Sequence, residues 1–233
     1  MTDIVERLQS VQRRVLDAPR PLGQSLPRLV AVSKFKSVHD IKSCYDAGQR
    51  NFGENYIKEL VEKSYQLPSD IMWHFIGTFQ SNKAKSLAGI LNFFVWETCS
   101  SVKHAISIDQ ALRDNPNRKQ PLKVFVQVNT SGEKAKGGCA VKDCKDVVEY
   151  VLRHSHKLQF SGLMTIGRDY GSTLSADNED FLLLLELRRE ICTELGLDSS
   201  TVELSMGMSS DFEHAIKLGS TNVRVGSLIF GSR

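Results

Sequence analysis

The sequence lacks the patterns that define several large classes of protein. Its 233 residues contain no apolar run near the roughly 18 residues that a membrane-spanning helix needs. The first six residues show no basic stretch followed by an apolar one, so we expect no secretory signal. The net charge is only +3, and no block of Lys and Arg carries interleaved aromatic residues. We therefore expect neither a membrane nor a nucleic acid as a partner.

Cysteine is scarce and lacks the spacing of a disulfide framework or a zinc site. The five cysteines are odd in number, and no two of them form a C-x-x-C pair. They are Cys44, Cys99, Cys139, Cys144 and Cys192. Scattered thiols of this kind are typical of reduced cysteines in the cytosol. We expect a cytoplasmic protein that holds no metal ion.

The composition of the chain is that of one ordinary globular domain. Hydrophobic residues make up 41% of the chain and charged residues 24%, which is the usual range for such a domain. No linker, low-complexity segment or shift in composition divides the sequence. We therefore treat residues 1–233 as a single domain, and this length suits a small barrel.

Strands and helices are predicted to alternate along the chain after a leading helix. Residues 3–17 place Ile4, Leu8 and Val11 at helical spacing, and prolines follow this stretch. The predicted strands span 29–32, 51–55, 72–77, 93–97, 122–129, 158–166, 202–205 and 222–225. The predicted helices between them span 37–48, 56–66, 80–87, 100–112, 141–153, 178–195 and 210–218.

Eight strand-then-helix units with short connections are typical of a closed (β/α)8 barrel. An open doubly wound sheet is the alternative, but it rarely uses eight regular units. The predicted fold is therefore α/β, a single TIM-like (β/α)8 barrel with an N-terminal helix. Where the helix after the first strand begins, Asp40 stands at capping-box spacing from Ser37.

Lys34 follows the first strand, at the end where barrel enzymes keep their reacting groups. A lysine there can be a solvated loop residue. It can also form a Schiff base, because an amine that is partly desolvated and near other cations loses its proton more readily and attacks an aldehyde. The local sequence leaves both roles open.

The loops after strands seven and eight contain groups that suit a phosphate, which often sits there in such barrels. The first loop contains Ser205, Gly207 and Ser209, and the second contains Gly226 and Ser227. Hydroxyls, adaptable glycine backbone and free N–H groups at a helix start all favour an anion. Ordinary helix capping would use the same residue types, so each loop taken singly is weak evidence.

Barrel closure connects the lysine to the phosphate-type loops. Strands one and eight should lie about 5 Å apart, so Lys34 is predicted to lie beside Gly226 and Ser227. A cofactor with an aldehyde and a phosphate on one small ring would span this distance. Pyridoxal 5′-phosphate (PLP) has these features.

Alternation along the eighth strand adds a cation to this predicted site. Val223 and Val225 share one face, so outward-packed valines would turn Arg224 into the barrel. Arg224 could form an internal ion pair with Glu54. It could instead face the pyridine nitrogen and keep it unprotonated, because arginine does not release its proton. Asn55, at the end of the second strand, could reach the cofactor from the other neighbour of strand one.

His74 is predicted to point into the barrel if its neighbours Trp73 and Phe75 pack against the helices. A histidine in such a position is more often a core residue with satisfied hydrogen bonds than an acid or base. We interpret His74 in this way and predict no catalytic residue.

These segments closely resemble the YggS/PROSC family of pyridoxal phosphate homeostasis proteins. The resemblance runs from about residue 28 to the end of the chain. The segments that carry it are 31–34 (AVSK), 52–55 (FGEN), 74–77 (HFIG) with Gln80, Asn82 and Lys83, 162–165 (GLMT), 205–211 (SMGMSSD), 224–227 (RVGS) and 229–231 (IFG). Phe35 and Ser37 depart from the Thr and Pro that are usual in the family, and Phe79 replaces a usual Leu.

The resemblance implies a barrel like the N-terminal domain of alanine racemase (fold type III), with PLP held as an aldimine on Lys34. It implies that Ser205, Gly226 and Ser227 contact the phosphate, where the amides around Gly207 would add donors. It also implies that Arg224 contacts the pyridine nitrogen.

Two functions remain open at this stage. The first is a non-catalytic, monomeric carrier that holds PLP, keeps the free aldehyde low and serves PLP-dependent apo-enzymes. The second is a PLP-dependent amino-acid racemase, which needs acid–base groups on both faces of the substrate. In the racemases the second face is served by a tyrosine from another subunit's extra β-domain, and this sequence contains no such domain, which favours the carrier. A Schiff-base aldolase is a poorer third option because it would not require Arg224 inside the barrel.

Overall fold

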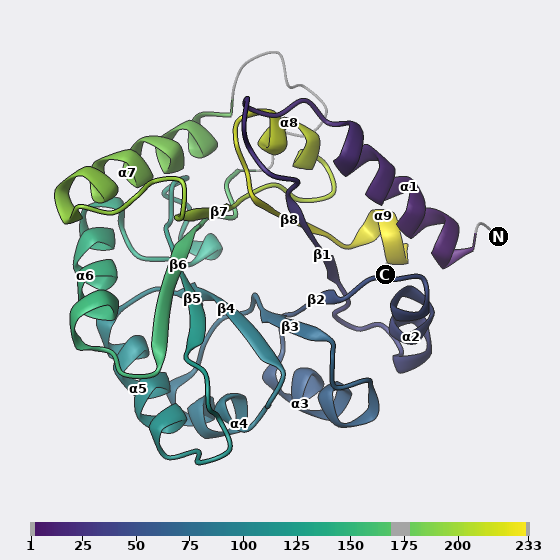
Figure 1. The fold of residues 1–233 in the computed structure, drawn as a ribbon, viewed down its shortest axis with the longest axis horizontal. Coiled ribbons are helices and arrows are strands. Elements are labelled where there is room, and N and C mark those ends of the chain that lie inside the picture. Colours follow the sequence, from purple (N-terminus) through teal and green to yellow (C-terminus); the bar gives the residue numbers. More distant parts are fainter. Residues whose placement is uncertain (1–2, 169–177, 232–233) are drawn as a thin grey trace.

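The computed structural model describes residues 3–168 and 178–231, which form a barrel of strands surrounded by helices (Figure 1). In this part of the chain eight parallel strands follow one another from β1 to β8, and β8 pairs with β1 to close the barrel. The predicted (β/α)8 barrel is confirmed, and the open-sheet alternative is wrong. The strands are β1 (Arg28–Val32), β2 (Asn51–Glu54), β3 (Met72–Phe75), β4 (Phe93–Cys99), β5 (Leu122–Gln127), β6 (Leu158–Met164), β7 (Glu203–Ser205) and β8 (Asn222–Val225).

The helices follow the strands in the predicted order, with differences at their ends. They are α1 (Ile4–Asp17), α2 (Val38–Asp46), α3 (Ile57–Gln66), α4 (Ala84–Ala88), α5 (Val102–Arg113), α6 (Cys144–His154), α7 (Glu179–Leu195), α8 (Phe212–Lys217) and α9 (Ser227–Phe230). Short 3-10 turns precede α4 and α6, at Ser81–Lys83 and Val141–Asp143, where the sequence predicted continuous helices. The sequence did not predict α9 or the 3-10 turn at Lys134–Lys136.

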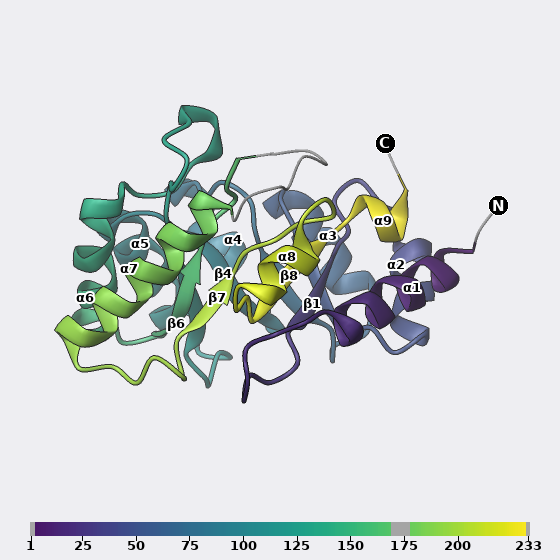
Figure 2. The same cartoon turned by 90° about the horizontal axis from the view of Figure 1, so that it is seen from above.

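Helix α1 packs beside α9 and α2 on the outside of the barrel (Figure 2). Its buried residues Leu8, Val11 and Val15 recur at helical spacing, as the sequence predicted. The guanidinium of Arg7 donates from Nε to the carbonyl of Ile229 in α9 at 2.7 Å. The leading helix is therefore fastened to the segment that follows β8.

The predicted capping box at the start of α2 is confirmed. The Asp40 amide donates to the Ser37 hydroxyl at 3.0 Å, and the Ser37 amide donates to an Asp40 carboxylate oxygen at 3.3 Å. These reciprocal bonds satisfy N–H groups that a helix start otherwise leaves without partners. They also fix the end of the loop that carries Lys34.

Side chains on the two faces of the strands differ in character. The outward faces contribute Phe52, Trp73, Phe75, Val223 and Val225 to the main hydrophobic core, shared with the helices. The inward faces contribute a small apolar cluster of Val95, Phe125 and Met164 and a set of buried polar side chains. The polar set includes His74, Glu97, Ser205, Asn222 and Arg224. The interior of this barrel therefore holds charges, and their partners determine what it can do.

All five cysteines are buried free thiols. Within residues 3–168 and 178–231, no group of three or more His, Cys, Asp or Glu side chains is arranged to hold a metal ion. No helix in the same residues has both the length and the apolar character needed to cross a membrane.

Candidate functional site

A cleft of about 580 Å³ lies at the carboxyl ends of the strands. It brings together five of the seven residues predicted to bind a cofactor, namely Lys34, Asn55, Arg224, Gly226 and Ser227. The rest of its lining is Val32, Lys36, Ile76, Met164, Ile166, Met208, Ser209, Ser210 and Gly231. A larger groove of about 840 Å³ lies along α4 and the end of α5 but contains none of the predicted residues. The chemistry of the side chains, not the volume, therefore identifies the candidate site.

Lys34 lies two residues beyond the end of β1, in a turn with unusual backbone geometry. Ser33 continues the strand pairing, with its amide donating to the carbonyl of Gly53 at 2.9 Å. Phe35 has φ of 62°, a left-handed conformation that costs a non-glycine residue roughly 1–2 kcal/mol. The half-exposed ring of Phe35 lies 5.0 Å from that of Tyr56. A strained turn of this kind persists only where neighbouring groups fix it.

A buried lysine on α3, Lys63, holds the turn that contains Lys34 and Phe35. Lys63 is only 6% exposed, and its ammonium donates to the Ser33 carbonyl at 2.9 Å, to Glu54 at 2.7 Å and to Glu59 at 2.8 Å. Glu59 in turn accepts from the Phe35 amide at 2.9 Å. Burial raises the pKa of the Glu54 carboxyl, and the attraction of Lys63 offsets this only in part. The turn that presents Lys34 is therefore held by charges that depend on one another.

Replacing Lys63 with Met should destabilise the protein strongly. Lys63→Met keeps an unbranched side chain one atom shorter but leaves the Glu54 carboxylate buried without its cation, which costs about 3–5 kcal/mol of unfolding free energy. The loss should shrink at acidic pH, because Glu54 can then take up a proton. Urea unfolding of the cofactor-free protein at two pH values measures both effects.

Lys58→Met is the matched control for this change. Lys58 lies on the same helix with a side chain that is 89% exposed, so the unfolding free energy should stay within about 0.5 kcal/mol of wild type. If Lys63→Met unfolded at the same urea concentration as Lys58→Met, the interpretation of the buried network would be wrong.

Arg224 points into the barrel from β8 and is only 4% exposed. Its Nη1 donates to the Ser205 hydroxyl at 2.5 Å, and its Nη2 donates to the Thr165 carbonyl at 2.8 Å. The alternative of an ion pair with Glu54 is wrong, because Glu54 bonds to Lys63 and Ser33 instead. Arg224 therefore presents a fixed cation to the cleft.

Two residues predicted to contact a phosphate do not line the cleft. Ser205 is fully buried, and its hydroxyl donates to Glu97 at 2.6 Å while accepting from Arg224. Gly207 has φ of +95°, and its carbonyl accepts from the amide of Arg224 at 3.0 Å. A Cβ at Gly207 would lie 2.6 Å from the Cβ of Ala215, so only glycine fits this turn. In this geometry Ser205 and Gly207 lie behind the residues that line the cleft.

Ser209, Ser210 and Ser227 line the cleft from the loops after β7 and β8. The Ser209 hydroxyl accepts from the Gly226 amide at 3.2 Å, which joins the two loops. Gly226 packs closely on β1, since a Cβ at this position would lie 3.3 Å from the Val32 carbonyl oxygen. The predicted closeness of strands one and eight therefore extends to the loops, and Ser227 shares the cleft with Lys34.

Asn55 approaches the cleft from the end of β2. Its side-chain oxygen is buried and has no hydrogen-bond partner among the described residues. A buried amide oxygen without a partner is unfavourable unless a ligand or water satisfies it. This atom therefore fits a site that is completed by a bound molecule.

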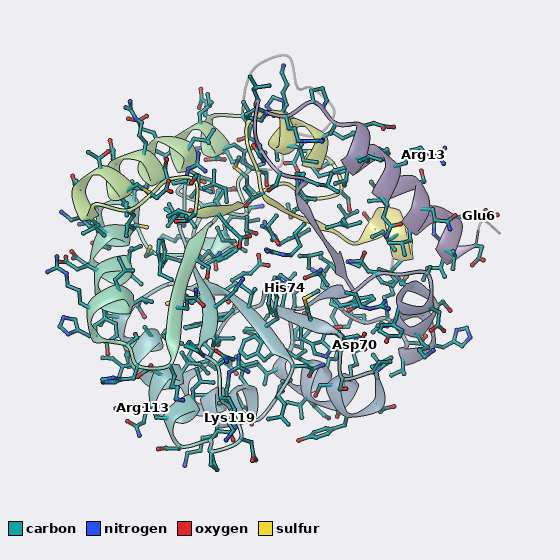
Figure 3. All side chains as sticks on the ribbon, in the orientation of Figure 1. Glu6, Arg13, Asp70, His74, Arg113 and Lys119 are labelled. Carbon is teal, nitrogen blue, oxygen red and sulfur yellow. The ribbon has the colours of Figure 1, made fainter. Side chains whose placement is uncertain are left out.

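His74 is a core histidine, as the sequence predicted. It is fully buried and lies near the middle of the barrel (Figure 3). Its Nδ1 lies 2.6 Å from a Glu97 oxygen, and its Nε2 lies 3.0 Å from the Asn51 side-chain oxygen. Neither ring nitrogen is left over for a substrate, and His74 is absent from the lining of the cleft.

Sequence reasoning missed Ser210, the Thr165 carbonyl and Glu97. Ser210 stands in the segment 205–211, which the sequence analysis singled out, but spacing alone could not choose among its three serines. Glu97 ends the apolar run of the predicted fourth strand, and a carboxylate in such a run was the available signal. A carbonyl such as that of Thr165 leaves no signal in a sequence.

The chain is similar to proteins that share this barrel. Residues 7–233 match the family described as alanine racemase, N-terminal domain. A relative from Homo sapiens called pyridoxal phosphate homeostasis protein is 46% identical over 233 residues, which cover 97% of this chain and 83% of the relative.

Solved structures agree with this relationship. PipY from Synechococcus elongatus, solved with PLP bound, is 30% identical and superposes with a TM-score of 0.82 over 98% of this chain and all of PipY. Alanine racemase from Streptomyces coelicolor is 15% identical, with a TM-score of 0.75 over 99% of this chain and 58% of the racemase. The second likeness extends to the fold alone.

Proposed function

The chain belongs to the alanine racemase N-terminal domain family, among its pyridoxal phosphate homeostasis proteins, and on this premise we propose that it binds PLP covalently at Lys34 as an intracellular carrier. The observation that carries the proposal is one cleft that contains an amine, a buried guanidinium and three hydroxyls, from Lys34, Arg224, Ser209, Ser210 and Ser227. The names of the relatives and the PLP-bound PipY structure support it.

Each group in the cleft has a counterpart on PLP. When bound, PLP supplies an aldehyde, and the amine of Lys34 holds it as a Schiff base. The hydroxyls of Ser209, Ser210 and Ser227 receive the phosphate. Arg224 donates to the pyridine nitrogen and keeps it unprotonated, which weakens the ring as an electron sink. The side-chain oxygen of Asn55 has no hydrogen-bond partner among the described residues. It accepts a hydrogen bond from the cofactor or from a water molecule that the cofactor binds.

The proposal is tested by loading the purified protein with PLP and passing it through gel filtration. A visible absorption band that stays with the protein supports covalent binding, since free PLP is removed in this step. If the protein emerges without the band after incubation with excess PLP, the proposed function is wrong.

We propose further that the bound cofactor is held without turnover. Of the described residues that line the cleft, only Lys34, Lys36 and Arg224 can carry a charge, and none is an Asp, Glu, His, Cys or Tyr. Racemisation needs an acid and a base on opposite faces of the substrate, and both lysines come from the loop after β1. The racemase alternative has less support from this lining.

Incubation of the PLP-loaded protein with L-alanine or L-serine in deuterated water should show no exchange of the α-proton beyond that caused by free PLP. The physical reason is that the described residues of the cleft supply no acid–base group opposite the two lysines, together with the damping effect of Arg224. Proton NMR follows the exchange, and a sample with the same concentration of free PLP is the control. Steady exchange or racemisation above this control would favour the racemase-like enzyme.

We also propose that the protein acts in the cytosol as a monomer and passes PLP to PLP-dependent apo-enzymes. The five free thiols support the location, because oxidising compartments convert such cysteines to disulfides. Light scattering of the loaded protein tests the monomer, and activation of an apo-enzyme by the loaded protein in the absence of free PLP tests the transfer.

A further inference from the structure

We infer that Glu97 is the counter-ion of Arg224 and sets the net charge that the cofactor meets in the cleft. This inference rests on the proposed function. Glu97 lies on β4 and is fully buried. It does not line the cleft and acts through Arg224, so it is a positioning residue and not a catalytic one.

Arg224 needs a counter-ion that its direct neighbours do not supply. Its two partners, the Ser205 hydroxyl and the Thr165 carbonyl, are neutral. Among the residues that the structure describes, no carboxylate forms a direct ion pair with it. A guanidinium keeps its proton even where burial lowers its pKa, as it does here. A buried charge without compensation is strongly unfavourable, so the compensation has to come through a neighbour.

Ser205 connects the two charges. Its hydroxyl has one proton to donate and can accept two hydrogen bonds. It accepts from Arg224 at 2.5 Å and from the Asn222 amide at 3.0 Å, so its single proton goes to Glu97 at 2.6 Å. The direction of every bond is therefore fixed, from the guanidinium through the hydroxyl to the carboxylate.

The surroundings keep Glu97 ionised. Burial alone would raise the pKa of its carboxyl, but hydrogen bonds from His74 and Ser205 and the charge of Arg224 together bring the pKa below its ordinary value. The Asn222 amide adds donors at 3.1 and 3.3 Å. Burial lowers the pKa of His74, and both of its ring nitrogens face oxygens, Nδ1 a Glu97 oxygen and Nε2 the Asn51 side-chain oxygen. On its other side the Glu97 carboxylate faces the Arg224 guanidinium across the Ser205 hydroxyl.

Other charged groups near this pair already have partners of their own. Arg28 and Glu203 form an ion pair of 2.6 Å, from the amino ends of β1 and β7. Asp211, before α8, accepts from the Met208 amide at 2.6 Å and also raises the pKa of Arg224 through space. Of the described residues that line the cleft, Lys34 and Lys36 are the charged groups besides Arg224. Among the described residues, Glu97 is the carboxylate that hydrogen bonds link to Arg224 through one side chain.

Glu97→Gln should change how the bound cofactor responds to pH. The substitution keeps the shape of the side chain but leaves Arg224 uncompensated, so the cleft becomes more positive by one charge. Added positive charge disfavours the protonated form of a nearby nitrogen. The pH midpoint at which the visible absorption of the PLP-loaded protein changes should therefore fall by about one unit. A role in packing alone would lower the affinity for PLP but leave this midpoint where it is.

Glu203→Gln is the matched control, because it removes the same charge from a carboxylate that pairs with Arg28. Its midpoint should equal that of wild type. An equal shift in both variants would reveal a general effect of net charge and overturn the inference. An unchanged midpoint in Glu97→Gln would overturn it as well.

A second pair of variants serves if Glu97→Gln does not fold. Ser205→Ala removes the connecting hydroxyl and should lower the midpoint by a smaller amount, whereas Ser205→Thr keeps the hydroxyl and should restore it. Equal midpoints in Ser205→Ala and wild type would contradict the connection. If wild type retained no PLP at all, the proposed function would fail, whereas retention of PLP with a midpoint insensitive to these changes refutes only the role of Glu97.

Discussion

Lys34→Ala should abolish the visible absorption band of the PLP-loaded protein while the protein still folds. The amine of Lys34 is the group that forms the covalent link, and alanine offers no substitute for it. The fold should survive because the turn is held by the Ser33 carbonyl and the Phe35 amide, which bond to Lys63 and Glu59 without the Lys34 side chain. Borohydride reduction followed by peptide mass mapping should find the pyridoxyl group on Lys34 of wild type and nowhere in the variant.

Lys83→Ala controls for a general effect of removing a lysine near this end of the barrel. Lys83 ends the 3-10 turn before α4 and does not line the cleft, so its variant should keep the band and the label. A label that maps to Lys36 or Lys83 in wild type would show that the assignment of Lys34 is wrong, even if PLP is retained.

The barrel could be predicted from the sequence because its signals are local and repeated. Each strand is a short apolar run, and each helix start or stop carries its own residues, as at Ser37 with Asp40. The inward direction of Arg224 followed from simple alternation with Val223 and Val225, and the pairing of β1 with β8 followed from closure. The predicted fold differed from the structure only at short turns, at the short helix α9 and at the ends of elements, where few residues determine the conformation.

The arrangement behind the site could not be predicted in the same way. Contacts such as Lys63 with the Ser33 carbonyl join residues 30 positions apart, and the bond of Ser205 to Glu97 joins residues 108 apart. Which serine of the segment 205–211 faces the cleft depends on how far the strands are displaced along one another in the closed barrel. That displacement is a property of the whole sheet, and no single segment records it.

The left-handed conformation of Phe35 also could not be predicted from the local sequence. Nothing in the residue type favours this conformation, because aromatic side chains rarely adopt positive φ. The turn exists because Glu59 and Lys63 hold the backbone on either side of Lys34. A departure from the family's usual residues was visible at this position, but its structural consequence was not.

PLP should bind far more tightly than pyridoxal, because the cleft supplies donors for a phosphate. The hydroxyls of Ser209, Ser210 and Ser227 can each donate to it, and a hydrogen bond to a charged group contributes about 1.5–3 kcal/mol. Three such bonds, at about 1.4 kcal/mol per tenfold, predict a preference on the order of a thousandfold. Lost solvation of the phosphate and non-additivity could reduce it to about a hundredfold. Titration with each compound, followed by the visible band, measures the preference.

Substitutions at Ser227 test whether this loop holds the phosphate. Ser227→Ala removes one hydroxyl and should weaken PLP binding about tenfold. Ser227→Asp places a negative charge against the phosphate and should abolish retention, with little effect on pyridoxal, which lacks that group. Ser199→Asp adds the same charge at an exposed position between α7 and β7 and should bind PLP like wild type. Equal affinities for PLP and pyridoxal, or full retention of PLP by Ser227→Asp, would mean that the phosphate lies elsewhere.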